Sequence, residues 1–177
     1  MLDDRSYMRE PDWRPEVARR GASLCLKLII INVVCFILQH SIRGFDESLA
    51  LFPSRLAQGR VWELLSYQFL HGGLFHLLIN CAMIWFVGRQ MEESLGKTKF
   101  LTLYLIAGVF GGLLQCLLTW THYLPEAGVV GASAGIFGLI AAFAMVFWER
   151  EITFLIMFII PVRMRAKYLL IALAVIG

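Results

Sequence analysis

The sequence is short of charged residues, since Asp, Glu, Lys and Arg make up only 16% of its 177 positions. A soluble domain usually carries about 25% of such residues and about 45–50% apolar ones. This chain is instead 59% hydrophobic, with a mean hydropathy of +0.70. The low share of charged residues and the high share of apolar ones together exclude an ordinary water-soluble core, a disordered chain and a collagen-like repeat. The composition therefore predicts a protein that folds in a lipid bilayer.

Motifs that carry other chemistries are also missing. No basic run alternates with aromatic residues, and the net charge is only +3, so nucleic acid is not an expected partner. Neither a phosphate loop nor a dinucleotide fingerprint is present, and we expect no cofactor. The cysteines lie inside apolar stretches and form no Cys-x-x-Cys pair, which is typical of buried small side chains. They are Cys25, Cys35, Cys81 and Cys116.

The N-terminal residues do not have the layout of a signal peptide. Residues 1–23 contain five arginines and five acidic residues before any apolar run begins, whereas a signal peptide has a short basic start followed by an apolar stretch. We therefore expect residues 1–23 to be a cytoplasmic tail. Residues 24–177 form the predicted transmembrane domain.

Long apolar runs are what the chain does contain. A bilayer core of about 30 Å takes roughly 20 helical residues, and four stretches satisfy this: 24–42, 71–90, 100–120 and 127–148. Residues 168–177 would begin a fifth span but cover only about 15 Å as a helix. The predicted fold is an all-α, polytopic helical bundle with four full spans and the start of a fifth. We therefore expect the chain to be incomplete at its C-terminal end.

The connection between the first two predicted spans is of mixed polarity. Residues 43–69 place Trp62, Tyr67 and Phe69 among polar side chains. Such a segment is too polar to cross the bilayer and too apolar to extend freely into water. It is typical of a segment that lies at the membrane interface.

The Lys and Arg residues predict the orientation. Twelve lie in the tail and in the connections 89–99 and 149–167, and three lie in the 43–69 connection. Because cytoplasmic loops carry the excess of these residues, the N-terminus is expected in the cytoplasm. This orientation places the start of the second span and the start of the fourth at the outer side.

Ser133 lies in a run of small residues, Gly-Ala-Ser-Ala-Gly, and is predicted about one helical turn below the outer surface. Small neighbours at a helix start leave a hydroxyl accessible, and the unpaired N–H groups of the first turn can stabilise an oxyanion. Small-xxx-small patterns, such as Gly108 with Gly112, are also ordinary packing faces of membrane helices. Taken alone, the pattern favours packing over catalysis.

His76 and Asn80 are four residues apart, so both side chains lie on one face of the second span. An imidazole and an amide can both donate to a tetrahedral oxyanion, although such a pair could equally bond neighbouring helices. His71 is rotated away from that face, and we expect it to hydrogen-bond the interfacial segment. Glu92 and Glu93 are expected to be solvated or helix-end charges.

A metal site is the alternative interpretation of the histidines, because all four are predicted on the outer side (His40, His71, His76 and His122). None of them has another histidine three or four residues away. No carboxylate lies near them at ligand spacing. The sequence therefore predicts no metal site.

Two separated motifs together resemble those of the rhomboid intramembrane serine proteases. The first runs from His71 to Asn80 (HGGLFHLLIN), after the lead-in WELLSYQFL that begins at Trp62, and the second is GASAG around Ser133. The segment EESLG, which begins at Glu92, adds to the likeness. The resemblance extends from about residue 60 to the end, with the motifs in the right order on the predicted spans.

The resemblance implies an intramembrane serine endopeptidase that cleaves transmembrane segments of other membrane proteins near the outer face. The expected partners are transmembrane substrates and the lipid bilayer, and the expected location is the inner membrane of a bacterium. The matched positions are Ser133 as nucleophile, His76 and Asn80 as oxyanion-stabilising side chains, Gly131 and Ala132 as backbone beside the nucleophile, and His71 as a structural histidine.

The chain departs from the family pattern at two points. The family's general base is a histidine on a sixth span, which this chain is expected not to reach, so the 177 residues are expected to be inactive alone. Glu63 stands where many relatives carry arginine. A catalytically inactive rhomboid-like protein that binds membrane clients is therefore an alternative. A transporter or channel fragment is a weaker one: Pro161 keeps it open, although the chain shows no inverted repeats.

Overall fold

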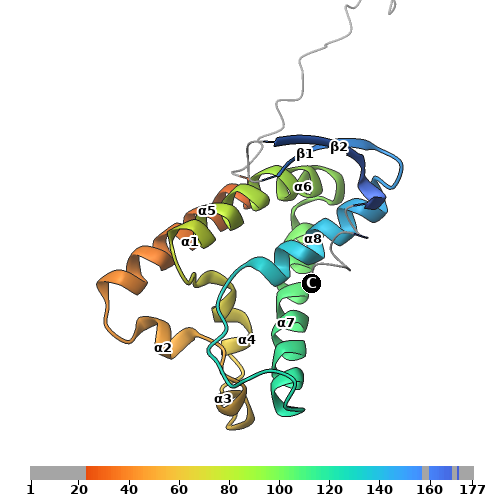
Figure 1. Cartoon of the computed structure of the whole chain (residues 1–177). Helices are drawn as coiled ribbons and strands as arrows, with labels where there is room; N and C mark the ends of the chain where they lie inside the picture. The colour runs from red at the N-terminus through yellow and green to blue at the C-terminus, as the bar shows by residue number, and fades with distance from the viewer. Residues whose placement is uncertain (1–22, 157–159, 169–170, 172–177) are drawn as a thin grey trace, which may run out of the picture.

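The structure is a computed structural model that describes residues 23–156, 160–168 and 171 (Figure 1). Nearly all of the predicted tail lies outside the described residues, and so does most of the predicted fifth span. The described chain is a bundle of helices with a small β-hairpin at one end.

Within the described residues, three helical segments are long and apolar enough to cross a bilayer. The first is α1 (Leu24–Ser41), and the third is α7 (Lys97–Trp120). The second is continuous from Leu74 to Leu95 and consists of α5 (Leu74–Met83), a π-helical turn η3 (Ile84–Gly88) and α6 (Arg89–Leu95). These helices confirm the predicted helical membrane bundle. The second helix begins at Leu74 instead of His71, and only Gly96 separates it from α7.

Apolar side chains cover both the inside and the outside of this bundle. Phe75 is 82% exposed and Phe110 67% exposed, which in water would be an aggregation hazard but in lipid is expected. The buried core joins α1, η3, α6, α7 and α8, and its largest completely buried side chains are Ile84, Met91, Phe100, Tyr104 and Leu139. A bilayer therefore replaces water as the solvent of the outer surface.

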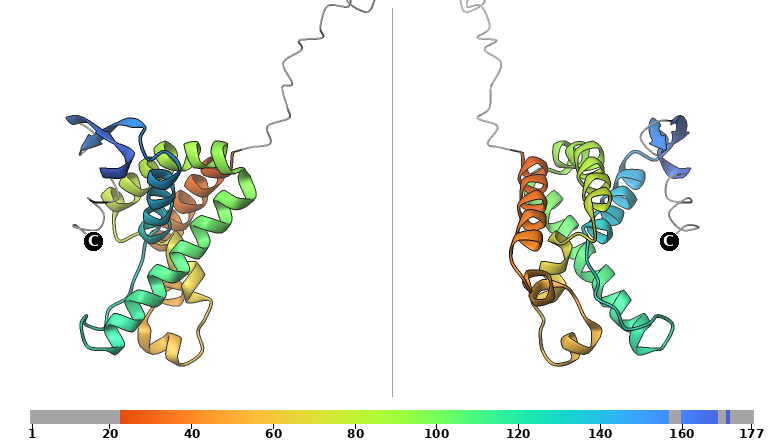
Figure 2. Two further views of the ribbon diagram at one scale, coloured as in Figure 1. Left: turned by 90° about the vertical axis from the view of Figure 1, so that its right-hand side faces the viewer. Right: turned by 60° about the vertical axis from the view of Figure 1, so that its left-hand side comes forward.

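The segment between α1 and α5 folds into short helices: α2 (Phe45–Leu49), α3 (Pro53–Ala57), α4 (Glu63–Ser66) and the 3-10 turn η2 (Tyr67–Phe69). These helices gather near the C-terminal end of α7, at the opposite end of the bundle from the hairpin (Figures 1 and 2). The Trp120 indole donates to the Pro53 carbonyl over 3.3 Å, which ties the segment to α7.

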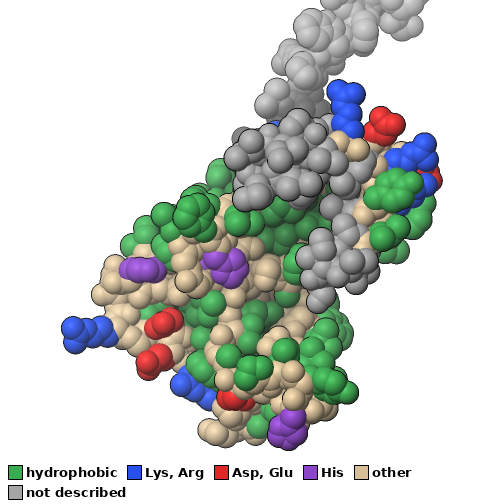
Figure 3. Space-filling view, in the orientation of Figure 1, with side chains coloured by type: hydrophobic (Ala, Val, Ile, Leu, Met, Phe, Trp, Pro, Cys, Tyr) green, Lys and Arg blue, Asp and Glu red, His purple; other side chains and the backbone are tan. Residues whose placement is uncertain are grey.

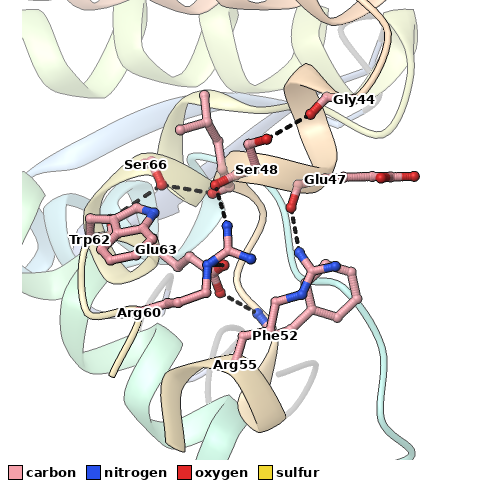
Figure 4. A network of polar contacts seen from close by, with 10 residues as sticks. Gly44, Glu47, Ser48, Phe52, Arg55, Arg60, Trp62, Glu63 and Ser66 are labelled. Atoms are coloured by element: carbon pink, nitrogen blue, oxygen red, sulfur yellow. Dashed lines mark hydrogen bonds and ion pairs between the residues drawn. The ribbon is translucent and has the colours of Figure 1, made fainter. Parts of the chain in front are cut away.

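Glu63 holds this segment together from inside. Its carboxylate is fully buried, accepts a hydrogen bond from the Phe52 N–H over 3.0 Å and pairs with Arg60 at 3.0 Å. Arg60 also donates to the Ser48 carbonyl over 3.0 Å, and Ser66 donates to the Leu49 carbonyl over 2.7 Å (Figure 4). The acidic residue at position 63 therefore finds its counter-charge within the same segment.

The fourth predicted span is shorter than expected. Helix α8 runs from Ser133 to Val146, 14 residues, which covers about 21 Å and is too short for a full crossing. The preceding residues are extended, because Val129 exchanges two backbone hydrogen bonds with Leu51, over 3.1 and 2.8 Å. Hydrophobicity alone did not distinguish this extended segment from helix, since its backbone groups find their partners elsewhere in the protein.

A β-hairpin follows α8 and was not predicted. Strands β1 (Glu151–Ile156) and β2 (Ile160–Arg165) pair antiparallel, with Glu151 opposite Arg165. Apolar runs of this length fit a strand as well as a short helix. The Glu149 carboxylate accepts hydrogen bonds from Arg165 over 2.9 Å and Lys167 over 2.8 Å, which fastens the base of the hairpin.

Of the two predicted alternatives for Glu92, a solvated charge or a helix-end charge, the buried position of this residue excludes the first. Its carboxylate accepts hydrogen bonds from the Ser23 hydroxyl, from the Leu24 N–H over 2.9 Å and from the Cys25 N–H over 3.0 Å. It therefore caps the N-terminus of α1 from a different helix. Only Glu93 matches the expectation of an exposed charge, and it pairs with Arg89 at 3.3 Å.

Candidate active site

Ser133 is the first residue of α8, and the chain before it is held in place by the interfacial segment. The Gly131 N–H donates to the Tyr67 carbonyl over 2.9 Å. Gly131 has φ of +131°, a conformation that side chains rarely tolerate. A Cβ added there would also lie 2.8 Å from the His76 ring. Glycine is therefore required at 131, and its backbone sets where α8 begins.

Small residues let α8 lie directly against α7. A Cβ added at Gly138 would be 2.2 Å from the Ala107 Cβ, and one added at Gly135 would be 2.8 Å from the Tyr104 carbonyl. On the facing helix, a Cβ at Gly111 would be 2.5 Å from the Ala134 Cβ. The small residues that follow Ser133 thus serve helix packing, as the packing interpretation predicted.

His76 and Ser133 both lie close to the Cβ side of Gly131. The position of a Cβ on Gly131 would be 3.0 Å from His76 Nε2 and 3.6 Å from Ser133 Oγ. The two atoms can therefore be no further apart than these two distances combined. A bound carbonyl group between them would lie within reach of both the hydroxyl and the imidazole.

The hydrogen bonds of His76 indicate which of its ring nitrogens carries the proton. The Gly72 N–H points to His76 Nδ1 over 3.4 Å, so this nitrogen accepts. In a neutral imidazole the proton then resides on Nε2, which is the nitrogen facing Gly131 and Ser133. His76 therefore presents a donor to the site, as an oxyanion ligand would, and not the lone pair that a base needs.

Asn80 lies one turn further along α5 and is only 4% exposed. Its amide group donates to the His76 carbonyl over 2.9 Å. Because an amide has two N–H groups, one remains for a second acceptor. Asn80 thus lies on the same helical face as His76, as the spacing predicted.

The start of α8 supplies further donors. The Ala132 N-cap position makes no side-chain cap, and the N–H groups of Ala132, Ser133 and Ala134 have no acceptor among the described residues. The Gly131 N–H, in contrast, is already bound to Tyr67. Unpaired N–H groups at a helix start attract developing negative charge.

His71 packs beside the site without joining it. Its ring lies 5.3 Å from the His76 ring in an edge-on arrangement and is only 2% exposed. Its backbone exchanges hydrogen bonds with the Gln39 side chain of α1, over 2.9 and 3.3 Å. These backbone hydrogen bonds lead to α1, and our prediction that His71 hydrogen-bonds the interfacial segment stays a prediction. Burial, together with the neighbouring His76, lowers the pKa of His71 to about 4, which keeps this ring neutral at physiological pH.

The sequence analysis missed two residues that position the site. Tyr67 binds Gly131 through its carbonyl and donates its hydroxyl to the Gly108 carbonyl over 2.6 Å, and Gln39 holds the backbone at His71. Local spacing carries no signal for either, since both act across elements far apart in the sequence. Among the described residues, no three His, Cys, Asp or Glu side chains group as metal ligands.

Fold and site together define a polytopic helical membrane protein that brings a serine hydroxyl and an imidazole close to one glycine, Gly131. A family model for the rhomboid domain matches residues 58–177. The chain therefore belongs to the rhomboid family.

Individual relatives are found in plants and bacteria. The chain is 39% identical over 121 residues to RHOMBOID-like protein 7 of Arabidopsis thaliana, a match that covers 60% of this chain and 37% of that protein. It is 25% identical over 130 residues to the rhomboid protease GlpG of Photorhabdus laumondii, with 73% and 46% covered. The match to GlpG of Pectobacterium atrosepticum is 29% over 119 residues, with 66% and 43% covered. The chain thus spans less than half the length of these relatives.

Proposed function

We propose that this protein is an intramembrane serine endopeptidase that cleaves transmembrane segments of other membrane proteins, with Ser133 as the nucleophile. The observation that carries the proposal is that Ser133 Oγ and His76 Nε2 both lie within 4 Å of the position that a Cβ on Gly131 would occupy. The family supports it as well, since two of the relatives are named as proteases.

In the proposed reaction, the Ser133 hydroxyl attacks the scissile carbonyl and the carbonyl oxygen becomes negatively charged. The Nε2–H of His76, the free N–H of Asn80 and the unpaired amides at the start of α8, beside Gly131 and Ala132, stabilise that charge. Because His76 is a donor in this arrangement, the proton of Ser133 has to go to another base. We expect that base to be a histidine on a sixth span.

The membrane setting follows from the same arrangement. We propose that residues 24–177 belong to a transmembrane domain, that the tail 1–23 lies in the cytoplasm, and that the membrane is the inner membrane of a bacterium. Ser133 then lies on the outer side, where the short α8 and the extended segment before it leave the hydroxyl half-buried.

Labelling with a serine-directed fluorophosphonate tests the proposal. The protein should be expressed from its complete gene, including any codons after residue 177, and reconstituted in lipid. We expect covalent labelling at Ser133, abolished by Ser133→Ala and reduced by His76→Ala, which removes an oxyanion donor worth roughly a hundredfold or more in rate. Ser48→Ala, which alters an exposed serine of the interfacial segment, is the matched control and should label normally. A complete protein that carries the expected base but is not labelled at Ser133 would contradict the proposal.

A further inference from the structure

A cavity of about 390 Å³ lies beside the candidate active site, between α1, the interfacial segment and the extended segment before α8. Its lining includes Gly72, Val130 and His71. Gly72 donates to the His76 ring and Val130 directly precedes Gly131. The cavity therefore shares a wall with the site that contains Ser133. A volume of this size lies at the small end of ligand pockets and suits a side chain better than a helix.

Two carboxylates on the cavity wall make no ion pair in the part of the chain that the structure describes. Asp46 and Glu47 line it, and neither makes an ion pair among the described residues. The nearby Arg55 guanidinium donates to the Glu47 carbonyl, while the Glu47 carboxylate points away from it (Figure 4). Acidic and histidine side chains are visible on this face of the molecule, with Lys or Arg side chains beside them (Figure 3).

The histidines on the wall add acceptors. His40 Nδ1 lies 2.9 Å from the Phe36 carbonyl and has to donate to it, so a neutral His40 leaves a lone pair on Nε2. His71 is buried, and neither of its ring nitrogens has a partner among the described residues. A buried polar ring without a partner costs free energy unless a ligand or water supplies one.

From this lining we infer that the cavity binds the guanidinium group of an arginine in the segment that flanks a substrate's transmembrane helix. A guanidinium offers five donors and no acceptor, which complements two unpaired carboxylates and imidazole lone pairs, and its charge forms strong hydrogen bonds with carboxylates. An extended peptide advances about 3.3 Å per residue, so an arginine a few residues from the scissile bond can reach the cavity. The inference rests on the proposed function, because it assigns the cavity to a substrate.

The first experiment tests the cation site without any substrate helix. L-Arginine methyl ester is titrated into the protein in lipid nanodiscs, while the side-chain resonances of ¹⁵N-labelled histidines are recorded. We expect saturable shifts of the His71 and His40 resonances, absent with L-citrulline methyl ester, which has the same α-amino group but an uncharged side chain. The double variant Asp46→Asn/Glu47→Gln should weaken binding on the order of tenfold or more. Glu126→Gln, an acid outside this cavity, is the control for charge and should leave binding unchanged.

The second experiment tests whether a substrate uses the site. Two transmembrane peptides that differ only by arginine or citrulline in the flanking segment are compared for binding to the same nanodiscs. A roughly tenfold preference for the arginine peptide, lost in the double variant, supports the inference.

The outcomes separate this inference from the proposed function. Equal binding of the two esters, or an arginine affinity unchanged by Asp46→Asn/Glu47→Gln, overturns the cation site even if Ser133 reacts with the fluorophosphonate. Equal binding of the two peptides overturns its use by substrates. If the arginine ester binds as expected but Ser133 does not react, the proposed function fails and the cation site stands. Thermal unfolding of the double variant, compared with the native protein, shows that the loss is not a loss of fold.

Discussion

Two buried polar side chains of the interfacial segment, Tyr67 and Gln68, pack against glycines of α7. A Cβ on Gly108 would lie 2.0 Å from Gln68 Oε1, and one on Gly112 would lie 3.0 Å from the Tyr67 ring. Gln68 in turn donates to the Leu64 carbonyl over 2.9 Å. The spacing of Gly108 and Gly112 predicted a packing face, but their partners are side chains of the interfacial segment, not a second helix. This contact fixes Tyr67, whose carbonyl holds Gly131.

The substitution Gly108→Ala should displace Gln68 and destabilise the protein by about 1–3 kcal/mol, because overpacking a tight contact costs this much. Gln68→Ala removes the side chain that would clash. In the double variant the penalty of the new methyl group should therefore be smaller than in the native background, and the two changes should not be additive. The coupling is measured from the free energies of unfolding in detergent of the native protein, the two single variants and the double variant. Additive effects would show that the two residues do not contact each other.

The buried ring of His71 should make stability depend on pH. Its pKa is about 4 in the fold against 6.5 ordinarily, owing to burial and the neighbouring His76. Between these values the unfolded chain binds a proton on this ring and the folded protein does not. The neutral His71 ring therefore adds about 3 kcal/mol to the free energy of unfolding above about pH 6.5. This contribution is lost as the pH falls to about 4.

The measurement compares the free energy of unfolding at pH 7 and pH 4.5 in native protein and in His71→Gln. The variant cannot titrate at this position, so it should lose less stability on acidification than the native protein. His122→Gln, in the loop after α7, serves as the control and should keep the native difference. Identical pH dependence in all three proteins would show that His71 is not responsible.

At the scale of elements, helix ends decide where functional groups lie. Helix α8 begins at Ser133 because the segment before it is bound to Leu51 and Tyr67, so the unpaired amides of its first turn face the candidate site. Helix α1 begins where Glu92 of α6 satisfies its first amides. The first amides of α8 are thus left without an acceptor among the described residues, whereas those of α1 are bound by the Glu92 carboxylate. Its negative charge also interacts favourably with the positive N-terminal end of the helix dipole.

Loss of this cap should destabilise the bundle. Glu92→Ala leaves the Leu24 and Cys25 amides and the Ser23 hydroxyl without their acceptor, at a cost of about 1–3 kcal/mol. The neighbouring Glu93→Ala removes only an exposed pair with Arg89 and should cost less than about 1 kcal/mol. Thermal unfolding of both variants in the same detergent makes the comparison. Equal losses would mean that the contacts of Glu92 contribute nothing beyond surface charge.

At the scale of the whole molecule, the two ends of the bundle differ. The interfacial segment, the C-terminal end of α7 and the carboxylate-lined cavity lie toward one end, and the hairpin and the capped start of α1 lie at the other (Figures 1 and 2). The distribution of Lys and Arg predicts that the hairpin end faces the cytoplasm. Ser133 would then be reached from the opposite side.

Cysteine accessibility in intact cells tests this orientation. We expect Tyr123→Cys, at a position that is 81% exposed in the loop after α7, to react with a membrane-impermeant maleimide added outside. Glu93→Cys should react only after the cells are opened. The native protein, whose cysteines lie within the apolar spans, gives the background. The reverse pattern would invert the predicted topology.

The sequence by itself determined that the chain is a helical membrane bundle, since hydrophobic run length and low charge depend on composition and on the thickness of the bilayer. It also predicted that His76 and Asn80 share a helical face, because the helical repeat is local. Only the tertiary structure decided that α8 starts at Ser133, that Glu92 caps α1 and that Ser133 and His76 both lie close to Gly131. Those features arise from hydrogen bonds and close contacts between segments distant in the chain, and residue spacing carries no information about them.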